Sequence, residues 1–188
     1  TATVSVTVTP VNDGPVALDD LYVASEDTVL TVAVPGVLGN DSDVDGDALS
    51  ASIGTGPAHG TLSLNSNGSF EYTPALDYTG TDSFSYYAND GAVDSNLALV
   101  TITVNAANDA PNANDDEATT PEDTGVTIAV LGNDTDADGD GLSIAAYGQG
   151  ANGTVWLNAD QTLSYTPNPD WFGTDTFSYT ASDGAVDS

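Results

Sequence analysis

The chain has 188 residues, and its 29 acidic side chains are accompanied by no lysine or arginine, so its formal net charge is −29 at pH 7. Such a chain cannot bind nucleic acid or anionic membranes through basic side chains and has no Schiff-base lysine, so its natural partners are cations. Hydrophobic residues, at 39%, suffice for packed cores, while the absence of cysteine excludes disulfides and thiolate metal sites.

The sequence repeats itself at an offset of 96 residues, which becomes 93 after a three-residue deletion. A fixed period of this kind indicates tandem copies of one module. We predict a first module over residues 11–107 and a second over residues 108–188. The clearest matches are Asn12-Asp13-Gly14-Pro15 with Asn108-Asp109-Ala110-Pro111, and Asp43-Val44-Asp45-Gly46-Asp47 with Asp136-Ala137-Asp138-Gly139-Asp140.

The first ten residues align with the end of the first module rather than with its beginning. Residues 2–8 match residues 98–104, the last predicted strand of the first module. We therefore expect residues 1–10 to be the last strand of a preceding repeat or a donor strand, and the second module to lack its own last strand. Two hypotheses stay open: a window cut from a longer array, or strand addition to the unfinished sandwich of a neighbour.

Within the first module, apolar residues alternate with a period of two, which is typical of strands. Clusters of Asn, Asp, Gly and Pro separate these segments. Seven short strands in about 95 residues predict an all-β fold, with an antiparallel Greek-key sandwich of the immunoglobulin type in each module. The predicted strands are, in chain order, residues 22–23, 29–34, 49–53, 60–64, 69–73, 82–88 and 97–104.

The acidic residues are clustered rather than spread. Each module places four aspartates at alternate positions around a glycine, Gly46 or Gly139. Carboxylates about 5 Å apart repel by roughly 3 kcal/mol per pair at an effective dielectric near 20, so these loops favour a counter-ion. The pattern matches the first half of a calcium loop, but Ser52 and Ala145 stand where an EF-hand needs glutamate. The remaining oxygen ligands must come from elsewhere.

Three further acidic groups open each module: an Asn-Asp junction, an Asp-Asp pair and a Glu-Asp pair. We predict that Ca²⁺ is the cofactor, because it accepts irregular sets of oxygen ligands. The predicted ligands in the first module are Asn12, Asp13, Asp19, Asp20, Glu26, Asp27, Asp41, Asp43, Asp45 and Asp47. Those in the second module are Asn108, Asp109, Asp115, Asp116, Glu122, Asp123, Asp134, Asp136, Asp138 and Asp140.

These motifs occur in the same order in both modules, with a few substitutions in the second. In the first module they are followed by Phe70-x-Tyr72-Thr73-Pro74 and Tyr78-x-Gly80-x-Asp82-x-Phe84. The ordered set resembles the cadherin-like tandem repeats of giant bacterial adhesins and RTX-type surface proteins. The resemblance covers nearly the whole chain, and it implies immunoglobulin-like sandwiches, calcium at or near the module junctions and an extracellular rod. By similarity to the cadherin linker, Asn108 and Asp109 would bridge the two modules, and Asn12 and Asp13 would bridge to a preceding one.

Several residues outside these motifs have plainer interpretations. Asp90 and Asp183 precede glycines and are expected in hairpin turns. Asp82 and Asp175 are expected to face solvent at strand starts. Trp171-Phe172 matches a core-like position near Tyr78 and is expected to pack rather than to bind sugar.

We therefore predict a non-enzymatic, calcium-stiffened spacer segment of an extracellular bacterial adhesin or surface fibre. Its expected partners are neighbouring repeats or identical subunits, and no nucleic acid. A second hypothesis is a subunit of an extracellular filament joined by exchange of residues 1–9. A third is a glycan-binding adhesin module, in which Trp156, Trp171 and Phe172 would form a platform, and a fourth is an accessory module of a secreted enzyme.

Overall fold

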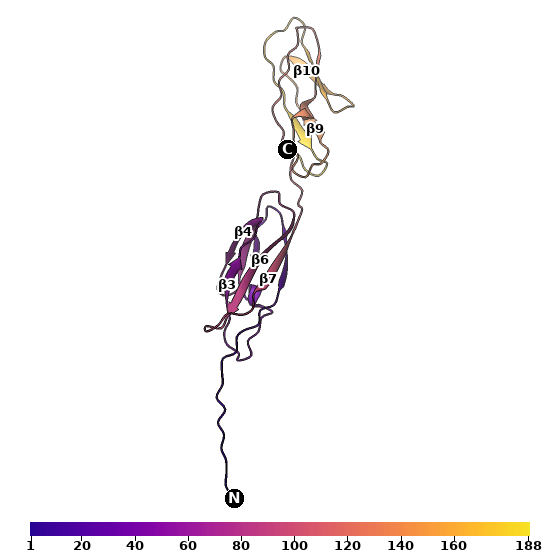
Figure 1. The fold of residues 1–188 in the computed structure, drawn as a ribbon. Coiled ribbons are helices and arrows are strands. Elements are labelled where there is room, and N and C mark those ends of the chain that lie inside the picture. The colour runs from indigo at the N-terminus through magenta and orange to yellow at the C-terminus, as the bar shows by residue number, and fades with distance from the viewer. The chain divides into compact units, whose positions relative to one another are not determined.

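The computed structural model describes all 188 residues and divides them into two compact units, Thr1–Ala107 and Asn108–Ser188. We call them unit 1 and unit 2. Their regular elements are strands, several of which Figure 1 labels, and two single-turn 3-10 helices, so the predicted all-β class is confirmed. None of the helical segments has the length or the apolar composition that spanning a membrane requires.

Unit 1 is a sandwich of two sheets. The four-stranded sheet has the order β1-β7-β6-β3, and the three-stranded sheet has the order β2-β5-β4. The elements of unit 1 are β1 (Asp20–Ser25), β2 (Leu30–Val32), η1 (Gly36–Leu38), β3 (Ser50–Thr55), β4 (Gly60–Leu64), β5 (Phe70–Pro74), β6 (Gly80–Asn89) and β7 (Ala98–Asn105).

The core of unit 1 follows from the alternation of apolar residues along its strands. Residues 98, 100, 102 and 104 of β7 are 0–2% exposed, whereas the residues between them point outward. Phe70 of β5 packs across the sandwich against Phe84 of β6 and Tyr22 of β1, with ring centroids 5.4 and 5.0 Å apart. Burying such aromatic side chains on both inner faces joins the two sheets.

One strand pair differs from the antiparallel arrangement that we predicted. β1 runs parallel to β7, with Asp20 opposite Val100 and Ser25 opposite Asn105. The remaining pairs of unit 1 are antiparallel. The difference arises because β1 and β7 are separated by five intervening strands, so they are not joined by a hairpin that would force opposite directions.

Unit 2 repeats this plan less completely. Its sheets have the orders β10-β11-β8 and β12-β9. Val130, Ile144, Val155, Leu163 and Tyr165 form its buried apolar cluster. The elements of unit 2 are β8 (Val126–Ile128), η2 (Val130–Gly132), β9 (Ser143–Tyr147), β10 (Gly153–Leu157), β11 (Leu163–Pro167) and β12 (Tyr179–Ser182).

Two strands of unit 1 have shortened or missing counterparts in unit 2. β6 has ten residues, whereas its counterpart β12 has four, and residues 173–178 before β12 carry no strand. Residues 116–121, the counterpart of β1, carry no strand either. The neighbouring Phe172 is 84% exposed, so the expectation that it packs is wrong; no continuous sheet forms beside it.

Residues 1–12 form no secondary structure and carry a row of exposed apolar side chains. Val4, Val6 and Val8 are 86%, 79% and 88% exposed. A strand needs a partner for its backbone N–H and C=O groups, and these residues pair with no strand of either unit. Their interpretation as the last strand of another sandwich stays a prediction.

Candidate metal centres

A loop of alternating aspartates in unit 1 brings three carboxylates together. Asp43, Asp45 and Asp47 each offer an oxygen within 4.8 Å of the others, and we call them the first triad. The Asp43 Oδ1 atom shapes the loop, because it accepts hydrogen bonds from the backbone N–H groups of residues 45, 46 and 47 at 2.9, 3.0 and 3.2 Å. Gly46 has a φ of +81°, which glycine adopts readily.

Unit 2 contains the same arrangement. The carboxylate oxygens of Asp136, Asp138 and Asp140, the second triad, also lie within 4.8 Å of one another. Here the Asp136 Oδ1 atom accepts a hydrogen bond from the Asp140 N–H at 3.0 Å, and Gly139 has a φ of +78°. The repeated sequence pattern therefore produces the same loop twice.

The leading aspartate of each triad has an unsatisfied oxygen. The Oδ2 atoms of Asp43 and Asp136 are buried and have no hydrogen-bond partner. A buried carboxylate oxygen without a partner is costly, and this chain has no lysine or arginine to compensate it. A hard cation with oxygen ligands, such as Ca²⁺, would remove that cost. The residues of both triads therefore fit such an ion.

The triads are linked to the segment that precedes each unit's first strands. The Asp45 Oδ2 atom accepts a hydrogen bond from the Asp13 N–H at 2.7 Å. In the same way, the Asp138 Oδ2 atom accepts one from the Asp109 N–H at 2.8 Å. Each Asn-Asp junction is thus held by the aspartate loop of the unit that follows it in sequence.

The asparagine side chains of these junctions donate hydrogen bonds to an aspartate outside the triads. The Asn12 Nδ2 atom donates to Asp90 Oδ2 at 2.9 Å, and the Val93 N–H and this amide hold the pKa of Asp90 below its usual range. Asn108 donates to Asp183 at 2.7 Å in the same manner. Asp90 also accepts from the N–H groups of residues 92 and 93, which confirms the predicted hairpin turn.

Asp41 lies outside the first triad, although it belongs to the same sequence run. The hydroxyl of Tyr86 lies 3.0 Å from each of its carboxylate oxygens, and the Leu18 N–H donates to Asp41 Oδ1 at 2.9 Å. Beside it, the Asp20 Oδ2 atom is buried without a hydrogen-bond partner. Burial and the charge of Asp41 raise the pKa of Asp20 to about 6. The adjacent Asp19 accepts a hydrogen bond from the Leu99 N–H at 2.8 Å.

Unit 2 repeats this carboxylate–tyrosine contact. The hydroxyl of Tyr179 lies 2.9 and 3.0 Å from the two oxygens of Asp134. Desolvation and the charges of Asp134 and Asp115 raise the pKa of Asp116. Sequence reasoning assigned Asp41 and Asp134 to the metal loops, but it gave no signal of their tyrosine partners.

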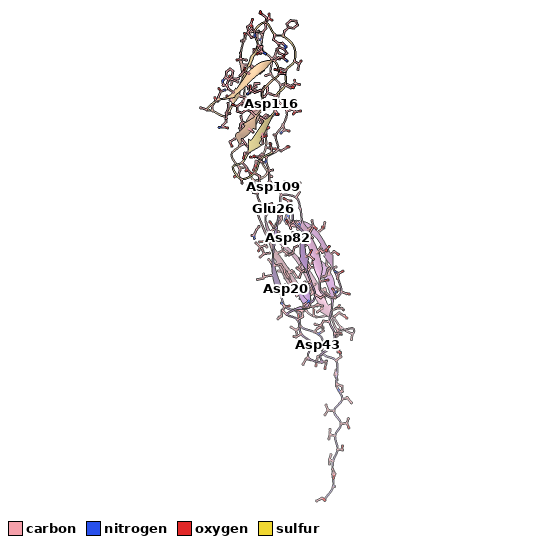
Figure 2. All side chains as sticks on the ribbon, turned by 180° about the vertical axis from the view of Figure 1, so that it is seen from behind. Asp20, Glu26, Asp43, Asp82, Asp109 and Asp116 are labelled. Carbon is pink, nitrogen blue, oxygen red and sulfur yellow. The ribbon has the colours of Figure 1, made fainter.

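The Glu-Asp pairs hold further parts of the backbone. Glu26 is only 2% exposed, and its Oε1 atom accepts a hydrogen bond from the Ala107 N–H at 2.7 Å. Its counterpart Glu122 is exposed. Asp27 accepts from the N–H of residue 77 at 3.3 Å, and Asp123 accepts from that of residue 170 at 2.9 Å. Figure 2 shows Glu26 and Asp43 towards opposite ends of unit 1, with Asp20 and Asp82 between them.

Asp82 is a buried anchor, and the expectation that it faces solvent is wrong. It is 3% exposed and accepts hydrogen bonds from the N–H groups of residues 58, 59 and 83 and from the Tyr72 hydroxyl, at 2.8–3.0 Å. Burial acts to raise the pKa of Asp82, but these hydrogen bonds outweigh it and lower the pKa. Asp175 and Tyr165 form the same contact in unit 2 at 3.0 Å. The only feature of the sequence that could have indicated these contacts is the ten-residue spacing of the Tyr-Asp pair, which both modules share.

Two family models match the chain, one for each unit. The bacterial cadherin-like domain matches residues 12–106. The bacterial Ig domain matches residues 108–188. The boundary between these matches coincides with the division of the structure into two units.

Individual proteins are similar to the chain over smaller regions or at low identity. The integrin beta-like protein B of Dictyostelium discoideum is 52% identical over 42 residues, which are 22% of this chain and 2% of that protein. Protocadherin gamma B4 has a TM-score of 0.48 and 18% identity, covering 96% of this chain and 32% of that one. An endo-fucoidan hydrolase from glycoside hydrolase family 107 has a TM-score of 0.44 and 19% identity, covering 97% of this chain and 28% of that one.

Proposed function

The chain belongs to the bacterial cadherin-like domain family, and from this premise we propose that it is a calcium-stiffened spacer segment of an extracellular adhesin or surface fibre. In this proposal it acts without catalysis, and its function is to hold the remaining parts of a longer surface protein at a distance. Its partners are neighbouring repeats of the same kind.

The observation that carries this proposal is the pair of aspartate triads, each of which contains a buried carboxylate oxygen without a hydrogen-bond partner. Each triad combines three converging carboxylates with one buried Oδ2 atom that lacks a hydrogen bond. The absence of lysine and arginine means that a metal ion is the natural source of positive charge for both loops. Ca²⁺ takes about six to eight oxygen ligands at irregular angles, which suits carboxylates that converge from alternate positions of one loop.

The hydrogen bonds around the linker support a stiffening role. The last residue of unit 1 is fixed to the rest of that unit, because the Glu26 carboxylate accepts a hydrogen bond from the Ala107 N–H. The first residues of unit 2 are likewise fixed to that unit, because the Asp138 carboxylate accepts a hydrogen bond from the Asp109 N–H. An ion in the second triad would fix the loop that contains Asp138 and thereby restrain the first residues of unit 2.

The acids also support a structural rather than a catalytic role. Asp82 is the most deeply buried aspartate, and four hydrogen bonds occupy its carboxylate. A general acid or base needs a free position for the substrate's proton, and this carboxylate has none.

Calorimetry with and without chelator tests the proposal. At a calcium concentration 100 times the dissociation constant, each site should add about 2.7 kcal/mol to the free energy of unfolding. We expect the melting temperature to fall in EDTA and to recover when calcium is restored. An equal melting temperature in calcium and in EDTA would contradict the proposal.

A pair of variants tests whether the calcium-dependent stabilisation arises at the first triad. Asp43→Asn combined with Asp45→Asn removes two ligands of the first triad and should abolish part of the calcium-dependent stabilisation. Glu71→Gln removes one negative charge from the exposed face of β5 and should leave the calcium response intact. If both variants respond to calcium like the parent chain, the first triad is not the binding site.

A further inference from the structure

The outer face of the four-stranded sheet of unit 1 carries no charged side chain. Its four strands contain only two acidic residues, Asp20 in β1 and Asp82 in β6. Asp20 lies opposite Val100 of β7, and Asp82 lies opposite Ile102 of the same strand. Both partners are completely buried, so both acids occupy positions that point into the sandwich. Because successive residues of a strand point to opposite faces, the outward positions of β1, β3, β6 and β7 are all uncharged, and we call them the neutral face.

The neutral face combines exposed aliphatic side chains with rows of hydroxyl groups. Leu21 and Val23 of β1 are 83% and 63% exposed, and Leu99 of β7 is 45% exposed. Neighbouring apolar side chains that remain in water, with polar residues around them, mark an interaction surface. The cross-strand register continues them into two rows, Leu21-Thr101-Ser83 and Val23-Thr103-Thr81.

Acidic side chains occupy other surfaces of unit 1. Glu71 lies on the exposed face of β5, in the opposite sheet. Asp45 and Asp47 are exposed in the loop of the first triad, and Asp27 and Asp77 are exposed in turns. The chain has no lysine or arginine, so a second copy offers no basic side chain to any of these acids. Contact between like charges costs several kcal/mol, so two copies associate best where neither contributes an acid.

The chemistry and the size of the neutral face suit a second copy of the same face. A hydroxyl group both donates and accepts hydrogen bonds, so the threonines and serines of one copy can pair with those of another. Four strands about 4.8 Å apart, each about eight residues long at about 3.3 Å per residue, form a face of roughly 500 Å². Two such faces bury about 1,000 Å² in total, which is near the lower limit for a specific interface. We therefore expect a weak, reversible dimer.

We propose that the neutral face of unit 1 binds the same face of a second copy of the chain. A two-fold axis relates the copies, so each contributes the same residues to the contact. Leu21 and Val23 of both copies leave water, while the acidic loops stay outside the interface. The contact joins chains side by side. The proposal goes beyond the spacer function and does not rest on calcium binding by the triads.

Sedimentation equilibrium of the full chain, from micromolar to millimolar concentration, tests the association. Physiological ionic strength is used, because a Debye length of about 8 Å limits repulsion between the acidic copies. We expect a monomer–dimer equilibrium. A chain that stays monomeric at all concentrations overturns the proposal, whatever its response to calcium. Binding of such a monomeric chain to uncharged phosphatidylcholine vesicles would assign the face to a lipid surface and would likewise overturn the proposal.

Two variants that add the same charge to opposite sheets test which face forms the contact. Thr101→Asp places a carboxylate on the neutral face, on a strand flanked by β1 and β6. Thr73→Asp places one on the outer face of β5, which is flanked by β2 and β4. We expect Thr101→Asp to weaken the dimer by about tenfold or more and Thr73→Asp to associate like the parent chain. Both side chains point away from the core, so both variants should keep the parent circular dichroism spectrum. Equal association of the two variants overturns the proposal.

A second pair of variants tests the apolar part of the contact without adding charge. Leu21 and Leu76 are 83% and 80% exposed, but only Leu21 belongs to the neutral face, since Leu76 lies in the loop between β5 and β6. Leu21→Ser should weaken the dimer several-fold, because burial of the leucine in the contact is lost. Leu76→Ser should leave the association unchanged. Neither leucine packs in the core, so the parent fold is expected in both variants. A dimer that is insensitive to Leu21→Ser, or equally sensitive to both substitutions, overturns the proposal.

Discussion

The hydroxyl of Tyr86 lies 3.0 Å from both carboxylate oxygens of Asp41, and it also lies 2.7 Å from the backbone oxygen of Val37. A phenol has one proton to donate, so this site contains more acceptors than donors. The Oδ2 atom of Asp20 adds a further unsatisfied acceptor. Burial raises the pKa values of both Asp20 and Asp41, and the charge of Asp41 raises the pKa of Asp20 further, whereas the hydrogen bonds from Leu18 and Tyr86 to Asp41 act in the opposite direction.

Removing the Tyr86 hydroxyl should destabilise unit 1. Tyr86→Phe takes away the donor that faces Asp41, and it leaves buried acceptors unpaired. We expect a loss of about 1–2 kcal/mol in the free energy of unfolding, measured by urea denaturation in EDTA. Tyr87→Phe is the matched control, because Tyr87 lies next along β6 on the opposite, more exposed face of the sheet. Equal effects of the two variants would show that the contact with Asp41 contributes nothing.

The stability of the calcium-free chain should rise when the pH falls from 7 to about 5. The pKa of Asp20 is about 6 in the folded chain and 3.8 ordinarily, so the folded state binds this proton more tightly. The resulting stabilisation is complete below pH 3.8 and is lost as the pH rises through 6. The lowered pKa values of Asp82 and Asp175 act in the opposite direction, but only below their ordinary range, near pH 3.8 and lower.

Urea denaturation at a series of pH values in EDTA measures this dependence. Asp20→Asn should remove much of the rise between pH 7 and 5, because the variant has no carboxyl to protonate. Asp94→Asn, in the exposed hairpin after β6, should keep the rise. A parent chain whose stability falls steadily over this interval would contradict the role given to Asp20.

The strands were predictable where their own side chains carry the signal. The sequence predicts β4 with the observed bounds, Gly60–Leu64, because its apolar residues alternate between two glycine-containing or polar turns. It predicts β1 only at residues 22–23, whereas β1 spans Asp20–Ser25. Asp20 and Ser25 are poor strand formers, and they belong to the strand because they pair with residues 100 and 105 of β7. A tertiary partner, rather than local sequence, therefore sets these ends.

The candidate sites were also predictable only where the residues of one site lie close together in the sequence. The alternating aspartates of both triads were predictable because all their members lie in one loop. The contacts of Asp41 with Tyr86 and of Asp82 with Tyr72 join residues 45 and 10 positions apart, and hydrophobic periodicity does not show them. Both tyrosines read as ordinary core residues, and only the folded strands bring their hydroxyls to the carboxylates.

Gly46→Ala should weaken the first triad without any steric clash. A Cβ atom at Gly46 would meet nothing within 4 Å, but its φ of +81° is unfavourable for alanine. We expect a loss of about 1 kcal/mol in stability in EDTA and a lower calcium affinity, measured by calorimetric titration. Gly141→Ala is the control, because Gly141 also has open space and its φ is not positive. Similar losses in the two variants would mean that the conformation of residue 46 is not what shapes the loop.

Asp82→Asn should be the most destabilising of these substitutions. The carboxylate accepts four hydrogen bonds from donors, and an asparagine would turn an NH₂ group towards at least one of them, the Tyr72 hydroxyl or a backbone N–H. We expect a loss of about 3 kcal/mol in the free energy of unfolding, because hydrogen bonds to buried charged groups contribute about 1.5–3 kcal/mol each. Glu71→Gln provides the control for loss of one negative charge.

A double-mutant cycle with Tyr72→Phe separates the tyrosine contact from the backbone contacts. The Tyr72 hydroxyl lies 2.8 Å from Asp82 Oδ2, so the two substitutions together should cost less than the sum of their separate effects. The backbone donors at residues 58, 59 and 83 remain in Tyr72→Phe, so this variant alone should cost less than Asp82→Asn. Strict additivity would show that the tyrosine does not stabilise the carboxylate. A larger loss for Tyr72→Phe than for Asp82→Asn would show that aromatic packing, rather than the buried charge, anchors the loop between β3 and β4.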